Sequence, residues 1–394
     1  MIYSFSMAIA IVSGALANKP GNGGNAWTRL QWVLGLRKLG IQTYFVEQIA
    51  RDACVDRTGA LADFSSSVNL AFFKDVMEGF GLGASSSLVY DNGEEIHGLS
   101  LGQLEQLASA SSLFINISGH LTFAPVRDRL RCRVYFDDDP AYTQFWYAAG
   151  NAGPRLEGHD FYYTIGGNID AKDCVIPTGG LPWRTMRPLI VLEHWPVSSD
   201  GERNRFTTVA SWRGPYGPIE HEGQTYGLKV HEFRKVLELP ERVPLTFEIA
   251  LNIHPADASD RAALIQHGWR LADPQTATST TDAYRRYLQL SGAEFSASQG
   301  IYVQTNSGWF SDRTACYLAC GKPALVQDTG FSRQLPVGAG LLTFRTLEEA
   351  IAGARQIAAN YEQHAQSARA LAEAHFDSNK VLGRLLEEVG VSPV

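Results

Sequence analysis

The sequence predicts two successive α/β domains, each built on a doubly wound parallel sheet. The chain has 394 residues, which is more than one hydrophobic core usually serves. Apolar strands alternate with amphipathic helices in both halves, as they do in βαβ units with right-handed crossovers. Residues 177–204 are rich in Pro and Gly at first and then polar, which is typical of a linker.

The first half opens with an apolar strand, a Gly-rich loop and an amphipathic helix. These segments are "MAIAIVSG" (7–14), "NKPGNGGN" (18–25) and "AWTRLQWVLGLRKLG" (26–40). The same periodicities predict further elements at 41–49 (strand), 69–80 and 100–110 (helices), and 112–119, 132–138 and 161–167 (strands).

The second half repeats the alternation. Its predicted elements are 206–212 (strand), a short helix within 226–240, 245–251 (strand), 258–268, 281–290 and 312–320 (helices), 322–328 (strand) and 346–376 (one or two helices). We expect one domain over 1–190, a second over 191–376, and a C-terminal helix over 377–394 that crosses back to the first. In such folds ligands bind at the carboxyl ends of the strands, so a cleft between the two domains is the natural site.

Composition excludes several classes of protein. Apolar residues make up 45% and charged residues 19% of the chain, as in soluble globular proteins. The formal net charge of −7 and the scattered arginines argue against general nucleic-acid binding, because no basic surface is available to displace phosphate counterions. The five cysteines are odd in number and widely spaced, which does not suit a disulfide framework and fits a reducing cytoplasm.

The N-terminal run "MIYSFSMAIAIVSGALANKPG" resembles a signal peptide only in part. It is apolar, but it lacks the positively charged start of such peptides, and a Gly-rich loop follows it at once. We therefore interpret it as the first buried strand. No segment holds about 18 uninterrupted apolar residues, so a membrane span is not expected. A cytoplasmic location follows.

The segment "NSGWFSDRTACYLACG" (306–321) is the first candidate site. Its Ser-Gly turn precedes a predicted helix whose N-cap is Ser311 or Asp312, and free backbone N–H groups at such an end favour an anion, notably a diphosphate. Arg313 lies in the first turn, where a cation opposes the helix dipole, and a bound anion would explain it. The alternative is an ordinary capped helix with a solvent-facing arginine. Cys316 and Cys320 share one helix face and are interpreted as buried small hydrophobes rather than zinc ligands.

Two further polar segments follow strands of the second half. In "QDTGF" (327–331), Asp328 and Thr329 could bind sugar hydroxyls, or they could simply form a turn. In "SWRGPYG" (211–217), Arg213 could complete a phosphate clamp across from Ser307 and Ser311.

With these segments in view, residues 205–376 resemble the donor-binding domain of GT-B glycosyltransferases. The likeness lies in "SASQGIYVQTNSGWFSDRTACYLACGKPALVQDTGF" and in "LPVGAGLLTFRTLEEAIAGARQIAANYEQHAQSARALAEAHF". The first half resembles the other GT-B domain more loosely, through its Gly-rich loop. The resemblance implies two Rossmann-like domains facing a cleft, with the acceptor in the first and the nucleotide sugar in the second.

The resemblance also implies an activity: metal-independent transfer of a hexose from a nucleoside-diphosphate sugar, such as a UDP-sugar, to a hydroxyl of a small-molecule or glycan acceptor. The donor is then a co-substrate, and no further cofactor is expected. The implied donor-binding residues are Trp212, Arg213, Ser307, Gly308, Trp309, Ser311, Asp312, Arg313, Asp328, Thr329, Gly330 and Phe331. The implied acceptor-side loop consists of Asn22, Gly23, Gly24 and Asn25.

The sequence departs from the pattern of the resemblance at two places. No Glu-x7-Glu motif, common in retaining members, occurs around 304–330. The histidine that inverting members place after the first strand is absent, and Asn18, Asn22 and Asn25 occupy that loop. The anomeric outcome therefore stays open between direct displacement and front-face retention.

A catalytic base must then come from elsewhere in the first half. His120 ends the strand in "FINISGH" (114–120), and histidine suits proton abstraction near neutral pH. Asp137, Asp138 and Asp139 end the strand in "YFDDDPAYTQFW" (135–146), and one of them could be the base or orient it. The alternatives are a loop histidine and an Asp-rich turn. The neighbouring aromatics of 142–147 and 161–163 could line an acceptor pocket or belong to the core.

Other functions remain open. An Asp-x-Asp after an apolar strand is also how GT-A enzymes hold Mn²⁺ or Mg²⁺, but these use one continuous domain, so we expect no metal. Glu47 ends the second strand as an NAD-binding acid would, although the glycines of "NKPGNGGN" do not match G-x-G-x-x-G. A GT-B-like epimerase of NDP-sugars and a non-catalytic sugar-nucleotide or glycan-binding protein are the remaining alternatives.

Overall fold

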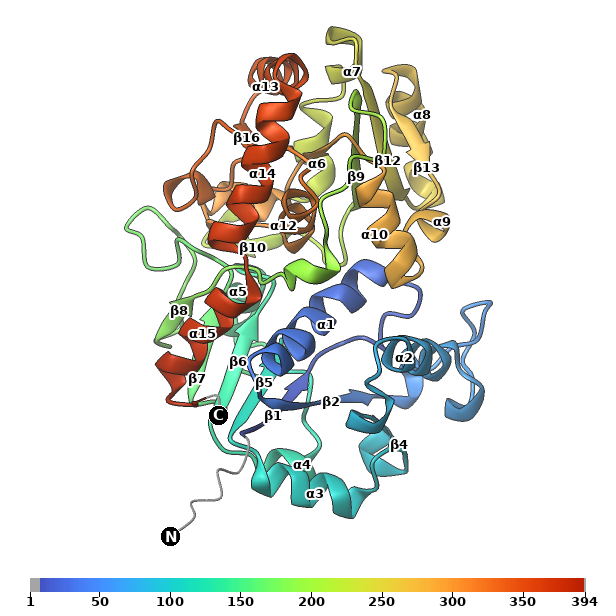
Figure 1. The fold of residues 1–394 in the computed structure, drawn as a ribbon, viewed down its shortest axis with the longest axis vertical. Coiled ribbons are helices and arrows are strands. Elements are labelled where there is room, and N and C mark those ends of the chain that lie inside the picture. Colours follow the sequence, from blue (N-terminus) through green and yellow to red (C-terminus); the bar gives the residue numbers. More distant parts are fainter. Residues whose placement is uncertain (1–7, 393–394) are drawn as a thin grey trace.

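The computed structural model describes residues 8–392 and consists of two α/β units, one above the other in Figure 1. Met7, where the first strand was expected to begin, the rest of residues 1–7, and the last two residues of the expected C-terminal helix lie outside the described residues.

The first unit contains an eight-stranded sheet in the order β4-β3-β2-β1-β5-β6-β7-β8. Every neighbouring pair is parallel except β3 and β4. The strand order changes direction at β1, so the carboxyl ends of β1 and β5 border the crevice where such sheets bind ligands. The strands are β1 (Ile9–Ser13), β2 (Gln42–Ile49), β3 (Ser86–Tyr90), β4 (Glu95–Gly98), β5 (Leu113–Ile117), β6 (Arg133–Asp137), β7 (Phe161–Thr164) and β8 (Trp183–Thr185).

Five helices belong to the first unit: α1 (Gly23–Lys38), α2 (Val68–Gly79), α3 (Leu101–Ala110), α4 (Ala124–Arg127) and α5 (Tyr142–Ala148). α1 begins at Asn22, whose side chain accepts a hydrogen bond from the Asn25 backbone N–H. From the sequence alone this helix is expected to begin at Ala26, which is three residues after its first residue in the structure, Gly23. Short 3₁₀ helices across the chain are η1 (Arg51–Ala53), η2 (Phe64–Ser66), η3 (Gly83–Ser85), η4 (Asp91–Gly93), η5 (Leu192–His194), η6 (Pro255–Asp257) and η7 (Phe331–Arg333).

The second unit contains a six-stranded parallel sheet in the order β13-β12-β9-β14-β15-β16. Its strands are β9 (Arg205–Ser211), β12 (Thr246–Asn252), β13 (Arg270–Ala272), β14 (Ala293–Ser296), β15 (Ala324–Gln327) and β16 (Leu341–Phe344), and a separate hairpin joins β10 (Ile219–His221) to β11 (Gln224–Tyr226). The helices are α6 (Lys229–Arg234), α7 (Leu239–Arg242), α8 (Ala258–Gln266), α9 (Pro274–Thr278), α10 (Thr281–Gln289), α11 (Gly300–Gln304), α12 (Asp312–Ala319), α13 (Leu347–Ala359) and α14 (Tyr361–His375). The two doubly wound parallel sheets confirm the predicted fold class.

The last helix, α15 (Ser378–Val389), packs on the first unit (Figure 1). The Ile190 backbone N–H donates to the carbonyl of Phe376, and that of Ser378 donates to the carbonyl of Ile190. Leu382 approaches α1 so closely that a Cβ at Gly35 would lie 2.7 Å from its Cδ1. The chain therefore passes between the units twice.

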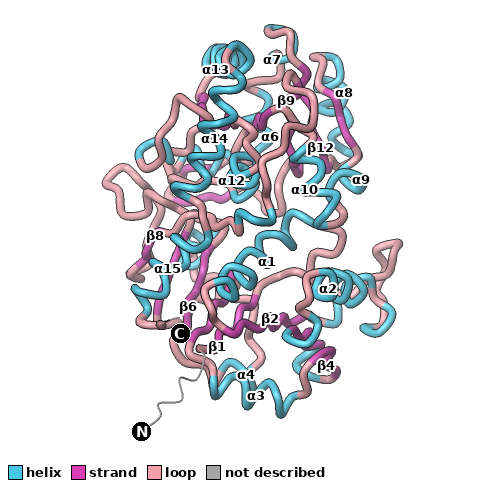
Figure 2. The backbone as a smooth tube through the Cα atoms, viewed as in Figure 1, coloured by secondary structure: helices cyan, strands magenta, loops and turns pink. Residues whose placement is uncertain are grey.

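The N-terminus of α1 lies against α10 of the second unit, and Figure 2 shows this junction near the middle of the molecule. A Cβ at Gly23 would lie 2.0 Å from the Thr280 carbonyl oxygen, and one at Gly24 would lie 2.8 Å from the Tyr284 ring. The Trp27 indole N–H donates to the Thr281 carbonyl at 2.8 Å. Small residues thus allow the two units to meet closely.

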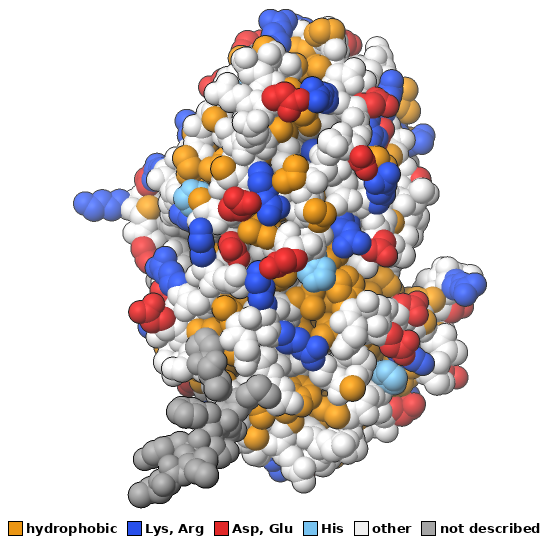
Figure 3. Space-filling view, in the orientation of Figure 1, with side chains coloured by type: hydrophobic (Ala, Val, Ile, Leu, Met, Phe, Trp, Pro, Cys, Tyr) orange, Lys and Arg blue, Asp and Glu red, His pale blue; other side chains and the backbone are white. Residues whose placement is uncertain are grey.

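Charged side chains of both signs are mixed on the surface. Lys and Arg side chains are interspersed with Asp and Glu over the face shown in Figure 3. Among the described helices, none combines the length and the apolar character that a bilayer crossing requires.

Candidate active site

Two adjoining cavities lie between the units, at the carboxyl ends of both sheets. The central cavity, of about 280 Å³, is lined by the start of α1, by Asp138 and Asp139 after β6, and by Trp309 and Asp312. The distal cavity, of about 530 Å³, extends along the ends of β9 and β12 to Lys229. Asn22, Val209 and Arg313 line both. Together they have the size and position of a ligand site.

Glu47 organises the Gly-rich loop after β1. Its carboxylate is fully buried and accepts hydrogen bonds from the backbone N–H groups of Leu16, Ala17 and Asn18, at 2.7–3.0 Å, and from the Asn18 side chain. Burial raises the pKa of Glu47, and these donors oppose that effect. The carboxylate is occupied by protein donors, so it does not serve as the ribose ligand that the NAD alternative needs.

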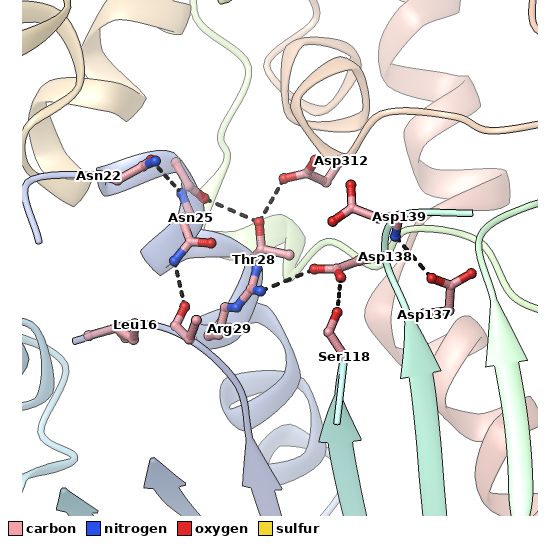
Figure 4. A network of polar contacts seen from close by, with 12 residues as sticks. Leu16, Asn22, Asn25, Thr28, Arg29, Ser118, Asp137, Asp138, Asp139 and Asp312 are labelled. Atoms are coloured by element: carbon pink, nitrogen blue, oxygen red, sulfur yellow. Dashed lines mark hydrogen bonds and ion pairs between the residues drawn. The ribbon is translucent and has the colours of Figure 1, made fainter. Parts of the chain in front are cut away.

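Asp138 belongs to a charged network at the end of β6 (Figure 4). Arg29 of α1 is 4% exposed, and its Nη2 lies 3.1 Å from Asp138 Oδ2, while the Ser118 hydroxyl donates to the same carboxylate. Burial favours the neutral acid, but Arg29, Ser118 and Lys19 hold the pKa of Asp138 below its ordinary value. Asp138 is therefore ionised at neutral pH and is a weak base.

Asp139 follows Asp138 in the sequence, but its pKa is shifted in the opposite direction. It lines the central cavity, and its Oδ1 accepts a hydrogen bond from Tyr302 of the second unit at 2.9 Å. Burial, together with the negative charge of Asp138, raises the pKa of Asp139 to about 7. A carboxyl group with this pKa can accept a proton from a bound hydroxyl near neutral pH.

The other two expected catalytic residues lie off the cavities. Asp137 is fully buried, and its oxygens accept hydrogen bonds from Thr143, Thr164 and Gln144 at 2.6–2.8 Å. Its Oδ1 also accepts a hydrogen bond from the backbone N–H of Asp139 at 3.2 Å, and Figure 4 shows this contact. His120 follows β5 but lines neither cavity. Burial and Arg29 lower its pKa to about 4, which makes it a weak base.

Lys229 is a cation that the sequence reasoning missed. It is the first residue of α6 and lines the distal cavity, and within residues 8–392 its amine forms no ion pair. Burial and the nearby Arg313 lower the pKa of Lys229 to about 7. Its position at the first helical residue, where the dipole disfavours a cation, is the signal that could have identified it. A bound anion would stabilise the charged amine against both its burial and the helix dipole.

Only 13% of the Arg313 side chain is exposed, so it is not the solvent-facing arginine of the alternative considered for it. Its Nε lies 2.7 Å from Glu294, its Nη1 donates to the Val209 carbonyl at 2.9 Å, and its Nη2 donates to Ser296. These contacts fix the guanidinium at the boundary of both cavities. Glu294 offsets part of its charge, so a diphosphate would need further cations.

Lys19 supplies another positive charge from the first unit. It lies in the loop before α1 and lines the central cavity, and its amine has no ion-pair partner in the described part of the chain. Burial by surrounding protein and the charge of Arg29 lower the pKa of Lys19. The sequence reasoning gave its loop to the acceptor side and overlooked this residue.

Three of the expected donor-binding residues lie at the junction between the units. Ser307 is fully buried, and its carbonyl accepts from the Asn168 backbone N–H of the first unit at 3.0 Å. Gly308 donates to the Thr329 carbonyl at 2.8 Å, and Gly330 accepts from the Asn168 side chain at 3.1 Å. None of these three lines the central or distal cavity.

Four more expected donor residues point elsewhere. Asp328 accepts from Arg345 at 2.7 Å, Phe331 packs on Phe310, and neither lines the central or distal cavity. The Trp212 indole donates to buried Asp260 at 2.8 Å. Arg213 is paired with Asp257, with Nε 2.9 Å from Oδ2. In this arrangement Arg213 is therefore paired with a carboxylate of its own unit and lines neither cavity.

Other expected residues do line the cavities. Trp309 and Asp312 line the central cavity, and Asp312 accepts a hydrogen bond from Thr28 of α1 at 2.8 Å (Figure 4). Ser311 precedes α12 without a side-chain cap. In the acceptor-side loop, Asn22, Gly24 and Asn25 line the central cavity, whereas Gly23 packs against the second unit.

Several other candidates lie in the core. Tyr142 and Phe145 are buried in the core and line neither cavity. Cys316 and Cys320 are buried free thiols, and burial raises the pKa of Cys320 to about 12. Within residues 8–392, no three His, Cys, Asp or Glu side chains are grouped as metal ligands would be.

No protein-family model and no curated protein sequence matches the chain. Several solved structures match almost its full length. An alpha-glucosyltransferase in complex with UDP and a 13-mer DNA is 13% identical, with a TM-score of 0.59, over 98% of this chain and 100% of that one.

Two further solved structures also match this chain over almost its full length. Anabaena HepE in complex with UDP and glucose is 11% identical, with a TM-score of 0.57, over 98% of this chain and 100% of that one. Sucrose-phosphate synthase from Thermosynechococcus elongatus is 11% identical, with a TM-score of 0.53, over 98% and 99% of the two chains. At these identities the likeness concerns the fold, and the chain has the GT-B fold.

Proposed function

We propose that this protein is a glycosyltransferase that moves a hexose from a nucleoside-diphosphate sugar to a hydroxyl of a small-molecule or glycan acceptor. The observation that carries the proposal is a pair of lysines, Lys19 and Lys229, which the two units contribute to one cleft beside Arg313 and which have no ion-pair partner among residues 8–392. Such cations suit the leaving diphosphate. UDP, present in two of the similar structures, is the first nucleotide to test.

In this scheme the diphosphate lies where the central and distal cavities meet. Lys229 and Arg313 stabilise the negative charge that develops on the leaving group, and Lys19 approaches from the opposite wall. The nucleoside occupies the distal cavity along Asn252 and Pro274. Because these side chains supply positive charge, the scheme uses no divalent cation.

The acceptor hydroxyl enters the central cavity, where Asp139 takes its proton. Asp139 has the pKa best matched to this step, whereas Asp138 and His120 are weaker bases. Arg29 and Tyr302 hold the neighbouring carboxylates in place from the two units. We therefore replace the expected set of His120, Asp137 and Asp138 with Asp139 as base and Asp138 as its charged neighbour.

The proposal is tested by thermal shift with UDP, TDP, GDP and NAD⁺, on the wild type and on Lys229→Met. UDP at 100 times its Kd should stabilise the wild type by about 2.7 kcal/mol. Lys229→Met should fold at least as stably, because it removes a poorly solvated amine, yet respond weakly to UDP. Lys74→Met is the matched control, since Lys74 is exposed on α2. Absence of any response to nucleoside diphosphates, or a response to NAD⁺ alone, contradicts the proposal.

Incubation of the wild type with UDP-glucose alone separates the remaining alternatives. A transferase should slowly release UDP and glucose when water replaces the acceptor. A binding protein should leave the donor intact, and an epimerase should convert it into another UDP-sugar. Product analysis by NMR distinguishes the three results.

A further inference from the structure

A third cavity, of about 250 Å³, lies behind the central one, and we call it the junction cavity. Ile165 and Pro188 line both the junction and the central cavity, so they form the partition between them. The residues after β7 and β8 supply one wall, Phe310 and Phe331 of the second unit another, and the end of α14 with α15 the third. This is where the chain passes between the units (Figure 1).

Aromatic and aliphatic side chains form one part of the lining of the junction cavity. Phe310 stacks on Phe376 with ring centroids 5.0 Å apart and planes 5° from parallel, and it meets Phe331 edge to face at 5.0 Å. Leu335 and Leu385 complete this surface. Binding of an aromatic or aliphatic group against these side chains is favourable, because it removes apolar surface from water.

The rim of the junction cavity is cationic. Arg187 contacts only neutral partners: its Nη1 lies 2.6 Å from His375 Nδ1, and its Nη2 donates to the Gln334 carbonyl at 3.0 Å. Lys380 donates to the Glu373 carbonyl at 2.8 Å. Within the described residues, neither cation has a carboxylate partner.

Glu388 also lines the junction cavity, but its carboxylate is not paired with Arg187 or Lys380. Glu388 lies 2.7 Å from Arg384 and accepts a hydrogen bond from Tyr163 at 2.7 Å. The charges of Arg187 and Lys380 are therefore left for another anion. The junction cavity thus combines apolar side chains with two cations that have no carboxylate partner within the described residues, and this combination suits an amphipathic anion.

We propose that the junction cavity binds a small amphipathic anion, with an aromatic or aliphatic body among Phe310, Phe331 and Leu385 and a carboxylate, sulfonate or phosphate at Arg187 and Lys380. The site is separate from the donor cleft. Because both units line it, the ligand favours the arrangement in which they meet, and its binding is coupled to binding in the central cavity across Ile165 and Pro188.

The probe is naphthalene-2-sulfonate, titrated by isothermal calorimetry into the full chain without nucleotide. Naphthalene-2-sulfonamide is the uncharged counterpart with the same body, and it should bind about tenfold more weakly, as loss of charge-assisted contacts predicts. Lys380→Gln should weaken the sulfonate several-fold and leave the sulfonamide unchanged, because Lys380 is exposed and its loss does not disturb the core.

A filling variant locates the site. Ala374 lines the junction cavity and is exposed, so Ala374→Trp places an indole in the cavity without repacking the core. It should reduce sulfonate affinity by at least about tenfold. Ala370→Trp is the matched control, because Ala370 is exposed one turn earlier on α14 and does not line the cavity. It should bind the probe like the wild type.

Three results would overturn the site: no binding of naphthalene-2-sulfonate, equal binding of the sulfonamide, or equal binding by Ala374→Trp and Ala370→Trp. None of these measurements involves UDP, so failure of the proposed transferase activity leaves them readable. Coupling is then measured by repeating the UDP titration with saturating sulfonate. A changed Kd for UDP supports coupling, and an unchanged one removes coupling from the proposal.

Discussion

Three successive carboxylates at the end of β6 have three different environments. Asp137 is surrounded by hydroxyl and amide donors, Asp138 by Arg29 and Lys19, and Asp139 by the hydroxyl of Tyr302 and the charge of Asp138. Their order in the sequence could not reveal this, because the groups that distinguish them come from α1, α5 and the second unit. The environment sets the pKa, and the pKa sets the role.

Asp139→Asn should lose about 100-fold or more of transferase activity if Asp139 is the base. In the wild type, the rate should fall as the pH drops below about 7, since the carboxyl group becomes protonated. The measurement is the initial rate of UDP release between pH 5 and 9. A wild-type rate that stays constant down to pH 5 would exclude Asp139 as base.

The ionised carboxylates of Asp138 and Asp139 should change the free energy of unfolding in opposite directions. The pKa of Asp139 is raised in the folded protein, so its destabilising effect is absent at pH 4 and grows as the pH rises through 7. Asp139→Asn should therefore melt higher than the wild type at pH 8. The pKa of Asp138 is lowered, so its stabilising effect is present at pH 8 and is lost in acid, and Asp138→Asn should melt lower at pH 8.

At the scale of elements, α1 brings the Gly-rich loop to the second unit. A Cβ at Gly23 would overlap the Thr280 carbonyl, so Gly23→Ala should destabilise the protein by about 1–3 kcal/mol. Gly79→Ala is the matched control, because Gly79 ends α2 and a Cβ there would meet no atom within 4 Å. It should stabilise by about 0.5–1 kcal/mol. Urea denaturation of both variants measures the difference, and equal effects would contradict the close contact.

Elements with a clear apolar period were predictable from the sequence, whereas others were not. The apolar runs of β1, β5 and β12 and the amphipathic period of α13 and α14 identified these elements. β3 begins with two buried serines and β4 is half-exposed, so neither has a hydrophobic signature. β13 and α9 are only 3 and 5 residues long, below the length at which periodicity is informative.

The candidate site was predictable only in outline. The sequence indicated a cleft, an anion-binding second unit and acids after β6. It assigned the diphosphate role to the segment that begins with Ser307, whose carbonyl accepts a hydrogen bond from Asn168 of the first unit in the structure. Small and polar residues before a helix suit both a phosphate and a tight junction between units. Only the three-dimensional arrangement separates the two.

At the scale of the whole molecule, the two units are joined by more than a linker. α1 packs on α10, Asn168 bonds to the loop of Ser307, and α15 returns from the second unit to cover α1. Leu382, Leu385 and Leu386 of α15 are at most 1% exposed. The first unit therefore completes its core with residues from the end of the chain, and the cleft depends on this connection.

A double-mutant cycle between Gly35 and Leu382 tests that connection. Leu382→Ala should cost about 2–5 kcal/mol, because it removes a buried side chain and leaves a cavity. Gly35→Ala should cost about 1–3 kcal/mol, because its methyl group would meet Leu382. In the double variant the new methyl group occupies part of the space that Leu382 leaves.

The double variant should therefore be more stable than the sum of the single effects by about 1 kcal/mol. Chemical denaturation of the four proteins gives this coupling free energy. Leu101→Ala, at a side chain that is 40% exposed on α3, should change the free energy of unfolding little and controls for the loss of any leucine. Strict additivity between Gly35 and Leu382 would mean that α15 does not pack on α1 in solution, and the cleft would then lose the support that holds the units together.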